Sequence, residues 1–145
     1  QVICLNDLFA TCADLLGNDL PPDAAEDSVS ILPALLGKAK KPIREATIHQ
    51  APAGLALRQG DWKLITLRNG TRELYNLKDD LSETRNLLEK NKEEAAGLQK
   101  LLQSYIDKGR STPGPAQKNE FDFDLEKSGD KKKNRKNKKN PPEEK

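Results

Sequence analysis

Four short stretches of alternating apolar and polar residues follow one another between residues 46 and 77. They span 46–51, 55–59, 62–67 and 72–77, and turn-forming residues stand in every gap, ending with an Asn-Gly pair at 69–70. Asn-Gly between two such stretches is the strongest short-range hairpin signal, and gaps this short allow only antiparallel pairing of successive strands. The sequence therefore predicts a four-stranded antiparallel meander.

An apolar sheet face needs a cover in water. Two stretches resemble capping boxes, one from Asp80 to Glu83 and one from Asn91 to Glu94, and each is predicted to begin a helix. The second is followed by a helical stripe and then by Gly109 as a stop. The stripe consists of Leu98, Leu101, Leu102, Tyr105 and Ile106. The predicted fold class is α+β, a small four-stranded antiparallel sheet covered by a C-terminal helix.

Two short helices are predicted before the sheet. The first follows Asn6 or Asp7 as N-cap and stops at Gly17, and the second follows Ser28 or Ser30 and stops at Gly37. The apolar residues of the first recur at helical spacing, namely Leu8, Phe9, Cys12, Leu15 and Leu16. A Pro- and Asp-containing linker separates the two helices.

The chain divides by charge near residue 110. Residues 1–110 hold 15 Lys+Arg against 16 Asp+Glu, whereas residues 111–145 hold 10 against 7. The second part has too few apolar residues to offset chain entropy, so 111–145 is predicted to be a disordered, basic tail. Its basic run begins at Lys131, ends at Lys139 and has seven Lys/Arg in nine residues without an aromatic residue. Two interpretations stay open, a solubilising tail or nonspecific contact with a polyanion.

No complete catalytic or metal site is visible in the sequence. The glycines stand singly, and neither a phosphate loop nor a Gly-x-Ser-x-Gly elbow is present. The carboxylate pair Asp79 and Asp80 fits a metal site less well than a helix cap. Cys4 and Cys12 are too far apart for a zinc pair or a redox motif, and both are predicted to be buried free thiols.

His49 is the one candidate substrate-binding residue. Strand alternation places it on the opposite face from Ile48, away from the covering helix. It is either an ordinary surface or interface histidine or a donor to an anionic substrate beside a partner domain. Trp62 also has two interpretations, packing in the core or binding a ligand, and core packing is favoured.

No stretch is apolar enough to span a bilayer, and the first residues lack the features of a signal peptide. The chain begins without Met, directly in an apolar run. We expect it to have been cut from a longer protein, so that missing targeting signals say nothing about its compartment.

Four segments, in order, resemble the C-terminal part of the sulfatase family, the arylsulfatase-type sulfuric ester hydrolases. "DLFATCADLLG" is similar to the family's Asp-x-x-Pro-Thr helix, with Ala10 in place of Pro. "EDSVSILPALLG" resembles its Asp-Gly-x-Ser-Leu-x-Pro-Leu-Leu segment, with Ser28 in place of Gly. "ALRQGDWKLI" resembles its Ala-x-Arg-x-Gly-x-Trp/Tyr-Lys strand pair. "ELYNLKDDLSETRNL" resembles its Glu-Leu-Tyr-Asp-Leu-x-x-Asp-Pro-x-Glu-x-x-Asn-Leu stretch, with Leu81 in place of Pro. With the closing "YIDKGRSTPG", the resemblance covers about residues 1–116.

The resemblance implies a hydrolase of aryl or carbohydrate sulfate esters that uses a formylglycine and a divalent cation, usually calcium. Members of the family carry these groups in a larger N-terminal catalytic domain. Neither Cys4 nor Cys12 fits the formylglycine motif, so no catalytic residue and no metal ligand transfers to this chain. What transfers is the smaller subdomain, a four-stranded sheet with a covering helix that helps shape the substrate pocket.

The leading hypothesis is therefore that residues 1–110 are an incomplete domain, the C-terminal subdomain of a sulfatase. Alone it would be inactive, and it would pack on an absent catalytic domain in a periplasmic or extracellular bacterial enzyme. His49 would reach toward the sulfate ester. The alternative is a noncatalytic module that binds polyanions through the run from Lys131 to Lys139.

Overall fold

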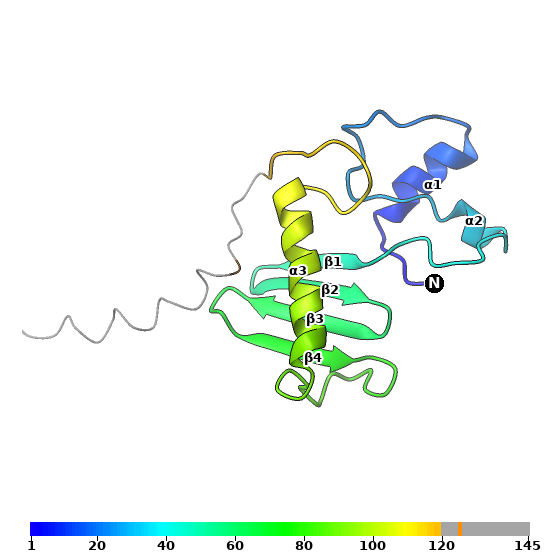
Figure 1. Cartoon of the computed structure of the whole chain (residues 1–145). Helices are drawn as coiled ribbons and strands as arrows, with labels where there is room; N and C mark the ends of the chain where they lie inside the picture. Colours follow the sequence, from blue (N-terminus) through cyan, green and yellow to red (C-terminus); the bar gives the residue numbers. More distant parts are fainter. Residues whose placement is uncertain (120–124, 126–145) are drawn as a thin grey trace, which may run out of the picture.

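A computed structural model describes residues 1–119 and residue 125, and it confirms the predicted fold class (Figure 1). Two short helices precede the strands, and one long helix follows them. The sheet order is β1-β2-β3-β4, with every neighbouring pair antiparallel. The elements are α1 (Asp7–Leu15), α2 (Leu32–Leu35), β1 (Thr47–Ala51), β2 (Gly54–Gln59), β3 (Trp62–Leu67), β4 (Arg72–Asn76) and α3 (Lys92–Lys108).

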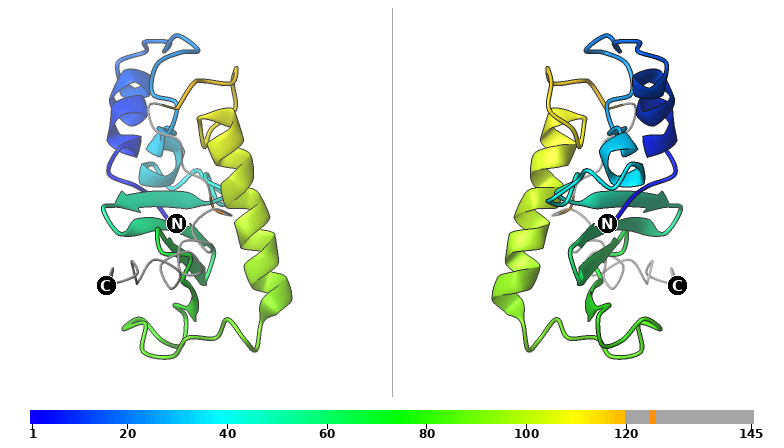
Figure 2. Two further views of the ribbon diagram at one scale, coloured as in Figure 1. Left: turned by 90° about the vertical axis from the view of Figure 1, so that its left-hand side faces the viewer. Right: turned by 90° about the vertical axis from the view of Figure 1, so that its right-hand side faces the viewer.

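The core lies between the sheet and α3. Leu57, Leu64 and Leu74 are register partners on three successive strands, and none of them is exposed. Leu98 and Leu102 of α3 pack against them, as the predicted stripe requires. Figure 2 shows α3 along one face of the sheet, whereas no described helix covers the other face. Trp62 is half-buried against this core, which confirms its predicted packing role.

Two glycines are required by the backbone. Gly54 begins β2 so close to β3 that a Cβ atom there would lie 2.2 Å from the carbonyl oxygen of Thr66. Gly109 ends α3 in the left-handed conformation (φ 64°), as predicted from its place after the stripe. Its amide donates to Ile106, and a Cβ atom there would meet the backbone of Gln117.

The predicted helix that begins with the capping box at 80–83 is wrong, because residues 80–90 form turns and irregular loop structure without a helix. The Asp80 carboxylate accepts from the amides of Thr84 (3.1 Å) and Arg85 (2.8 Å), further along the chain than a helix N-cap reaches. Glu83 does not reach back to Asp80. It has a positive φ of 54° and forms an ion pair with Lys63 of β3 at 2.6 Å.

The same loop protects the outer edge of the sheet. The side-chain oxygen of Asn86 accepts from the amide of Leu74 (3.1 Å), and the amide of Leu87 donates to the Leu74 carbonyl (2.8 Å). Backbone groups of β4 that would otherwise face solvent at Leu74 are thereby paired. At the start of α3, Asn91 makes no side-chain cap bond and donates instead to Leu87, so the predicted helix is confirmed but its capping box is wrong.

Acid stability should depend on Asp80. The two backbone hydrogen bonds from Thr84 and Arg85 hold the pKa of this carboxyl below its usual value of 3.8. A carboxyl with a lowered pKa in the folded state stabilises the fold above its unfolded pKa, and this contribution is lost as pH falls through the folded pKa. We expect Asp80→Asn to be less stable than the parent chain at pH 7 and to lose less stability between pH 5 and pH 2. Urea denaturation across that range measures both, and an unchanged acid profile would contradict the assignment.

The helix α1 packs through a different face from the one its sequence pattern indicates. Its buried residues are Asp7, Ala10 and Thr11, whereas Phe9 is 60% exposed and Leu16, just beyond its end, is 74% exposed. Asn6 makes no side-chain cap bond. Both cysteines are free, but Cys12 is exposed and Cys4 only half-buried, so the prediction of two buried thiols is wrong. The apolar stripe of α1 has no partner among the described residues that would bury it.

Residues beyond α3 make tertiary contacts as far as the structure describes them. Leu125 is 7% exposed and belongs to the core cluster with Leu102 and Tyr105. The basic run between Lys131 and Lys139, interpreted either as a solubilising tail or as a nonspecific polyanion contact, lies outside the described residues. Among the described residues no helix is long and apolar enough to cross a membrane.

Candidate functional site

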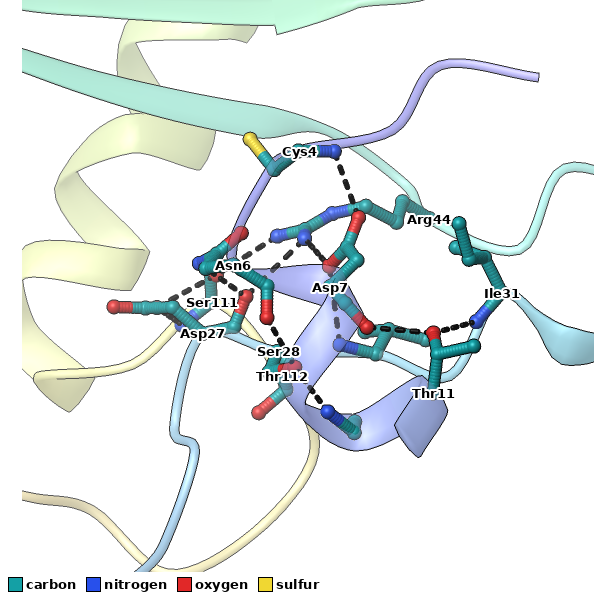
Figure 3. Close-up of polar contacts among 12 residues, drawn as sticks. Cys4, Asn6, Asp7, Thr11, Asp27, Ser28, Ile31, Arg44, Ser111 and Thr112 are labelled. Carbon is teal, nitrogen blue, oxygen red and sulfur yellow. Dashed lines mark hydrogen bonds and ion pairs between the residues drawn. The ribbon is translucent and has the colours of Figure 1, made fainter. Parts of the chain in front are cut away.

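A buried ion pair between Asp7 and Arg44 is the centre of the polar contacts drawn in Figure 3. The Asp7 residue has no exposed surface, and the Arg44 side chain is 2% exposed. The carboxylate also accepts from the amides of Cys4 (2.8 Å) and Val29 (3.1 Å). A buried carboxylate is tolerated when it is paired and hydrogen-bonded in this way.

Arg44 uses its remaining donors inside the protein. Its Nε donates to the Ala46 carbonyl (3.2 Å), Nη1 to the Asp27 carbonyl (3.1 Å) and Nη2 to Ser111 Oγ (3.3 Å). Ala46 lies just before β1, whereas Asp27 belongs to the loop before α2 and Ser111 to the segment after α3. Together with Asp7, Arg44 therefore joins three segments that are distant in the sequence, and it is not placed to bind a substrate anion.

The segment after α3 is held on the loop before α2 by further bonds. The amide and hydroxyl of Ser111 both donate to Asp27 Oδ1, at 2.8 and 2.7 Å. Arg110 donates to the Pro22 carbonyl at 2.9 Å, and the Thr112 hydroxyl donates to the Glu26 carbonyl. We call the residues Asp7, Asp27, Arg44, Ser111 and Thr112 the clasp. The clasp holds α1 and the loop before α2 next to the segment that follows α3.

The contacts of the clasp are not visible in the sequence. Asp7 is recognisable there as a helix cap and as part of the segment "DLFATCADLLG", whereas Arg44 stands in a loop without any recognisable motif. The partners are 37 residues apart. No pattern in the sequence around Arg44 identifies its partner.

His49 lies where strand alternation placed it, exposed on the sheet face opposite α3. Its Nε2 is 3.8 Å from Cys4 Sγ. Burial raises the pKa of the Cys4 thiol, so the thiol is neutral at pH 7 and a poor nucleophile. The predicted site residue His49 thus lies beside Cys4, which the sequence did not assign to the site.

Three cavities lie near these elements in the described part of the chain, and none of them is lined by His49. The first, of about 290 Å³, lies between α3 and the β1–β2 hairpin, and its walls include Leu55, Leu102 and Arg110. The second, of about 640 Å³, lies beside the first residues of the chain and the β2–β3 turn. The third, of about 450 Å³, lies at the clasp beside Arg44. No group of three or more His, Cys, Asp or Glu side chains that could hold a metal ion exists within residues 1–119.

No family model matches the chain. A curated relative, the N-acetylgalactosamine-6-O-sulfatase of Bacteroides thetaiotaomicron, is 34% identical over 116 residues, and the match covers 68% of this chain. The chain belongs to the sulfatase family. It corresponds to the C-terminal part of a sulfatase and spans 22% of the length of this relative.

Solved structures agree with this membership. One, from work on the metabolism of multiple glycosaminoglycans by Bacteroides thetaiotaomicron, is 35% identical with a TM-score of 0.58, and the match covers 68% of this chain and 24% of that one. Another, solved in complex with its substrate D-glucosamine-2-N,6-O-disulfate, is 26% identical with a TM-score of 0.57, covering 68% of this chain and 22% of that one.

The sulfatase-like motifs coincide with the clasp. Asp7 and Thr11 are the matching residues of the first motif, and Thr11 Oγ1 donates to the Asp7 carbonyl and accepts from the amide of Ile31 (3.0 Å). Asp27 of the second motif accepts from Ser111 in the closing segment. In this sulfatase segment the motif residues thus hold the N-terminal segments to the sheet-and-helix unit.

Proposed function

We propose that this chain is the C-terminal part of an enzyme that hydrolyses carbohydrate sulfate esters, and that it builds walls of the active site without supplying the reacting groups. The names of the relatives support the substrate class, since they describe a galactosamine sulfatase and a bound glucosamine disulfate. Aryl sulfate esters are the second substrate class that the family resemblance suggests. In this proposal the enzyme is exported, to the periplasm or outside the cell.

The observation that carries the proposal is an exposed apolar surface around α1 and α2. Its eight large side chains are between 49% and 84% exposed. They are Ile3, Leu5, Leu8, Phe9, Leu15, Leu16, Leu35 and Leu36. A surface of this kind marks an interaction site. We assign it to the remaining part of the sulfatase, because this chain spans 22% of its curated relative.

The cofactors of the family do not fit the described residues. Residues 1–119 hold no cluster of metal ligands, and neither Cys4 nor Cys12 lies in a formylglycine motif. In the proposal, the divalent cation and the formylglycine belong to the catalytic part. This chain then contributes packing and, through His49, one hydrogen-bond donor at the pocket.

Activity measurements test the proposal directly. The purified 145-residue chain should not hydrolyse N-acetylgalactosamine-6-sulfate or a chromogenic aryl sulfate, whereas the longer protein that contains it should hydrolyse one of them. In that longer protein, His49→Ala should raise KM about tenfold with kcat little changed, as expected for one lost hydrogen bond to a charged group. Gln50→Ala is the matched control, because Gln50 points to the α3 side of β1 and lines the 290 Å³ cavity. Turnover by the isolated chain would overturn the proposal.

The isolated chain should also self-associate through the exposed surface. We expect the weight-average mass in analytical ultracentrifugation to rise with concentration. Exposing the apolar side chains around α1 and α2 to water is unfavourable, and association of two chains would bury them. The double variant Phe9→Gln/Leu16→Gln should move the chain toward monomer. Leu81→Gln, at a leucine 80% exposed elsewhere, should leave association unchanged. A parent chain that stays monomeric at high concentration would count against an interface on α1 and α2.

A further inference from the structure

Cys4 is the hydrogen-bond partner of the His49 ring, and the proposed function gives this cysteine no role. Its Sγ lies 3.8 Å from His49 Nε2. Within residues 1–119, no other group forms a hydrogen bond with the ring. His49 is exposed on β1, an edge strand of the sheet. Without the contact to Cys4, its imidazole would therefore be free to change rotamer.

The clasp fixes the backbone of Cys4. Its amide donates to the Asp7 carboxylate (2.8 Å), and its carbonyl accepts from the amide of Asp7 (3.1 Å). Asp7 is itself buried and paired with Arg44, so these two bonds hold Cys4 in one place. Figure 3 shows the sulfur atom of Cys4 pointing away from this carboxylate. The buried ion pair thus keeps the thiol beside β1.

The chemistry of the two side chains determines where the ring proton lies. A thiol can both donate and accept a hydrogen bond, and an imidazole has two distinct nitrogens. In a neutral imidazole, the hydrogen bond made by one nitrogen decides which of the two carries the proton. Burial raises the pKa of the Cys4 thiol, so the thiol keeps its proton at pH 8 and can donate to Nε2. The ring proton then lies on Nδ1, which can donate to an anion.

Building on the proposed sulfatase function, we propose that Cys4 is a positioning residue, which directs the Nδ1–H group of His49 toward the sulfate group of the substrate. Cys4 does not contact the substrate and takes no part in the hydrolysis. The contacts run from the Asp7–Arg44 pair through the backbone of Cys4 to its thiol and then to the imidazole. In this way the clasp connects the packing of α1 with substrate binding at β1.

Nitrogen-15 NMR of the untagged 145-residue chain tests the contact without any enzyme activity. The chain has a single histidine, so the ring signals belong to His49. At pH 8, above the usual titration range of imidazole, we expect the ring proton of the parent chain on Nδ1. Cys4→Ala should move a large part of the proton population to Nε2. This variant keeps both backbone bonds with Asp7, and we expect it to fold like the parent.

Cys12→Ala is the matched control for the NMR measurement. It removes the same thiol from an exposed position on α1, where no hydrogen bond connects it with the ring. The ring signals of His49 should therefore be the same as in the parent chain. A parent chain with the ring proton on Nε2 would overturn the proposal. The same holds for a Cys4→Ala chain with the ring proton placed as in the parent.

Kinetics of the longer protein test the positioning role. Cys4→Ala should raise KM about threefold with kcat little changed, less than the about tenfold increase expected for His49→Ala, because the ring is still present. In a His49→Ala background, adding Cys4→Ala should change KM by less than about 1.5-fold, since the thiol acts only through the ring. A purely structural role of Cys4 predicts the same increase in both backgrounds, and that result would overturn the proposal.

The proposed function and the positioning role fail in different ways. A longer protein that hydrolyses no sulfate ester would overturn the proposed function. The NMR result would still show whether Cys4 sets the position of the ring proton. An active longer protein in which Cys4→Ala leaves KM unchanged would instead overturn the positioning role alone.

Discussion

Replacing Arg44 by methionine should lower the free energy of unfolding by about 3–5 kcal/mol, the usual cost of leaving one partner of a buried ion pair alone. Asp7 would keep its two backbone donors but would lose its cationic partner in a place where the residue has no exposed surface. The contacts of Arg44 with Asp27 and Ser111 would be lost as well. Urea denaturation followed by circular dichroism measures the change.

Two further variants make this result specific. Arg58→Met removes a half-buried arginine that donates to the nearby Gly60 carbonyl, and it should cost less than about 1 kcal/mol. The double variant Asp7→Asn/Arg44→Met should recover part of the loss, because the uncompensated charge is gone. An Arg44→Met chain within about 1 kcal/mol of the parent would show that the clasp does not stabilise the fold.

Leu64→Ala should lower the free energy of unfolding by about 3–5 kcal/mol, the range for a fully buried leucine whose site cannot collapse. Leu64 has no exposed surface, and its register partners are Leu57 and Leu74, both equally buried. It lies in an inner strand with α3 above it, so the cavity left by the side chain has rigid walls on three sides.

Leu81→Ala is the matched control for this core prediction. The same side chain is removed there from a residue 80% exposed, so a change within about 0.5 kcal/mol is expected. Hydrogen exchange should show the largest loss of protection for Leu64→Ala in the amides of β2, β3 and β4. A loss below about 1.5 kcal/mol would mean that the sheet and α3 do not form one close-packed core.

These two variants separate the parts of the fold that are readable from sequence from those that are not. Leu64 was predictable as a core residue, because the apolar face of an alternating strand and the apolar stripe of α3 are both buried when they pack against each other. Arg44 was not predictable, since no periodicity connects a loop residue with a carboxylate 37 positions away. The same holds for the candidate site. Strand alternation predicted the position of His49, but nothing in the sequence predicted that Cys4 lies beside it.

Local patterns by themselves determined the four strands, the long helix and the glycine stop at Gly109. Each of these depends on residues close together in the chain, where period and turn chemistry leave few alternatives. Only the tertiary structure decided which partner Asp7 binds, that Asp80 closes a loop instead of a helix, and that the stripe of α1 faces outward. The physical reason is that a carboxylate or an apolar face is satisfied equally well by many partners, and only the packed chain determines which one is within reach.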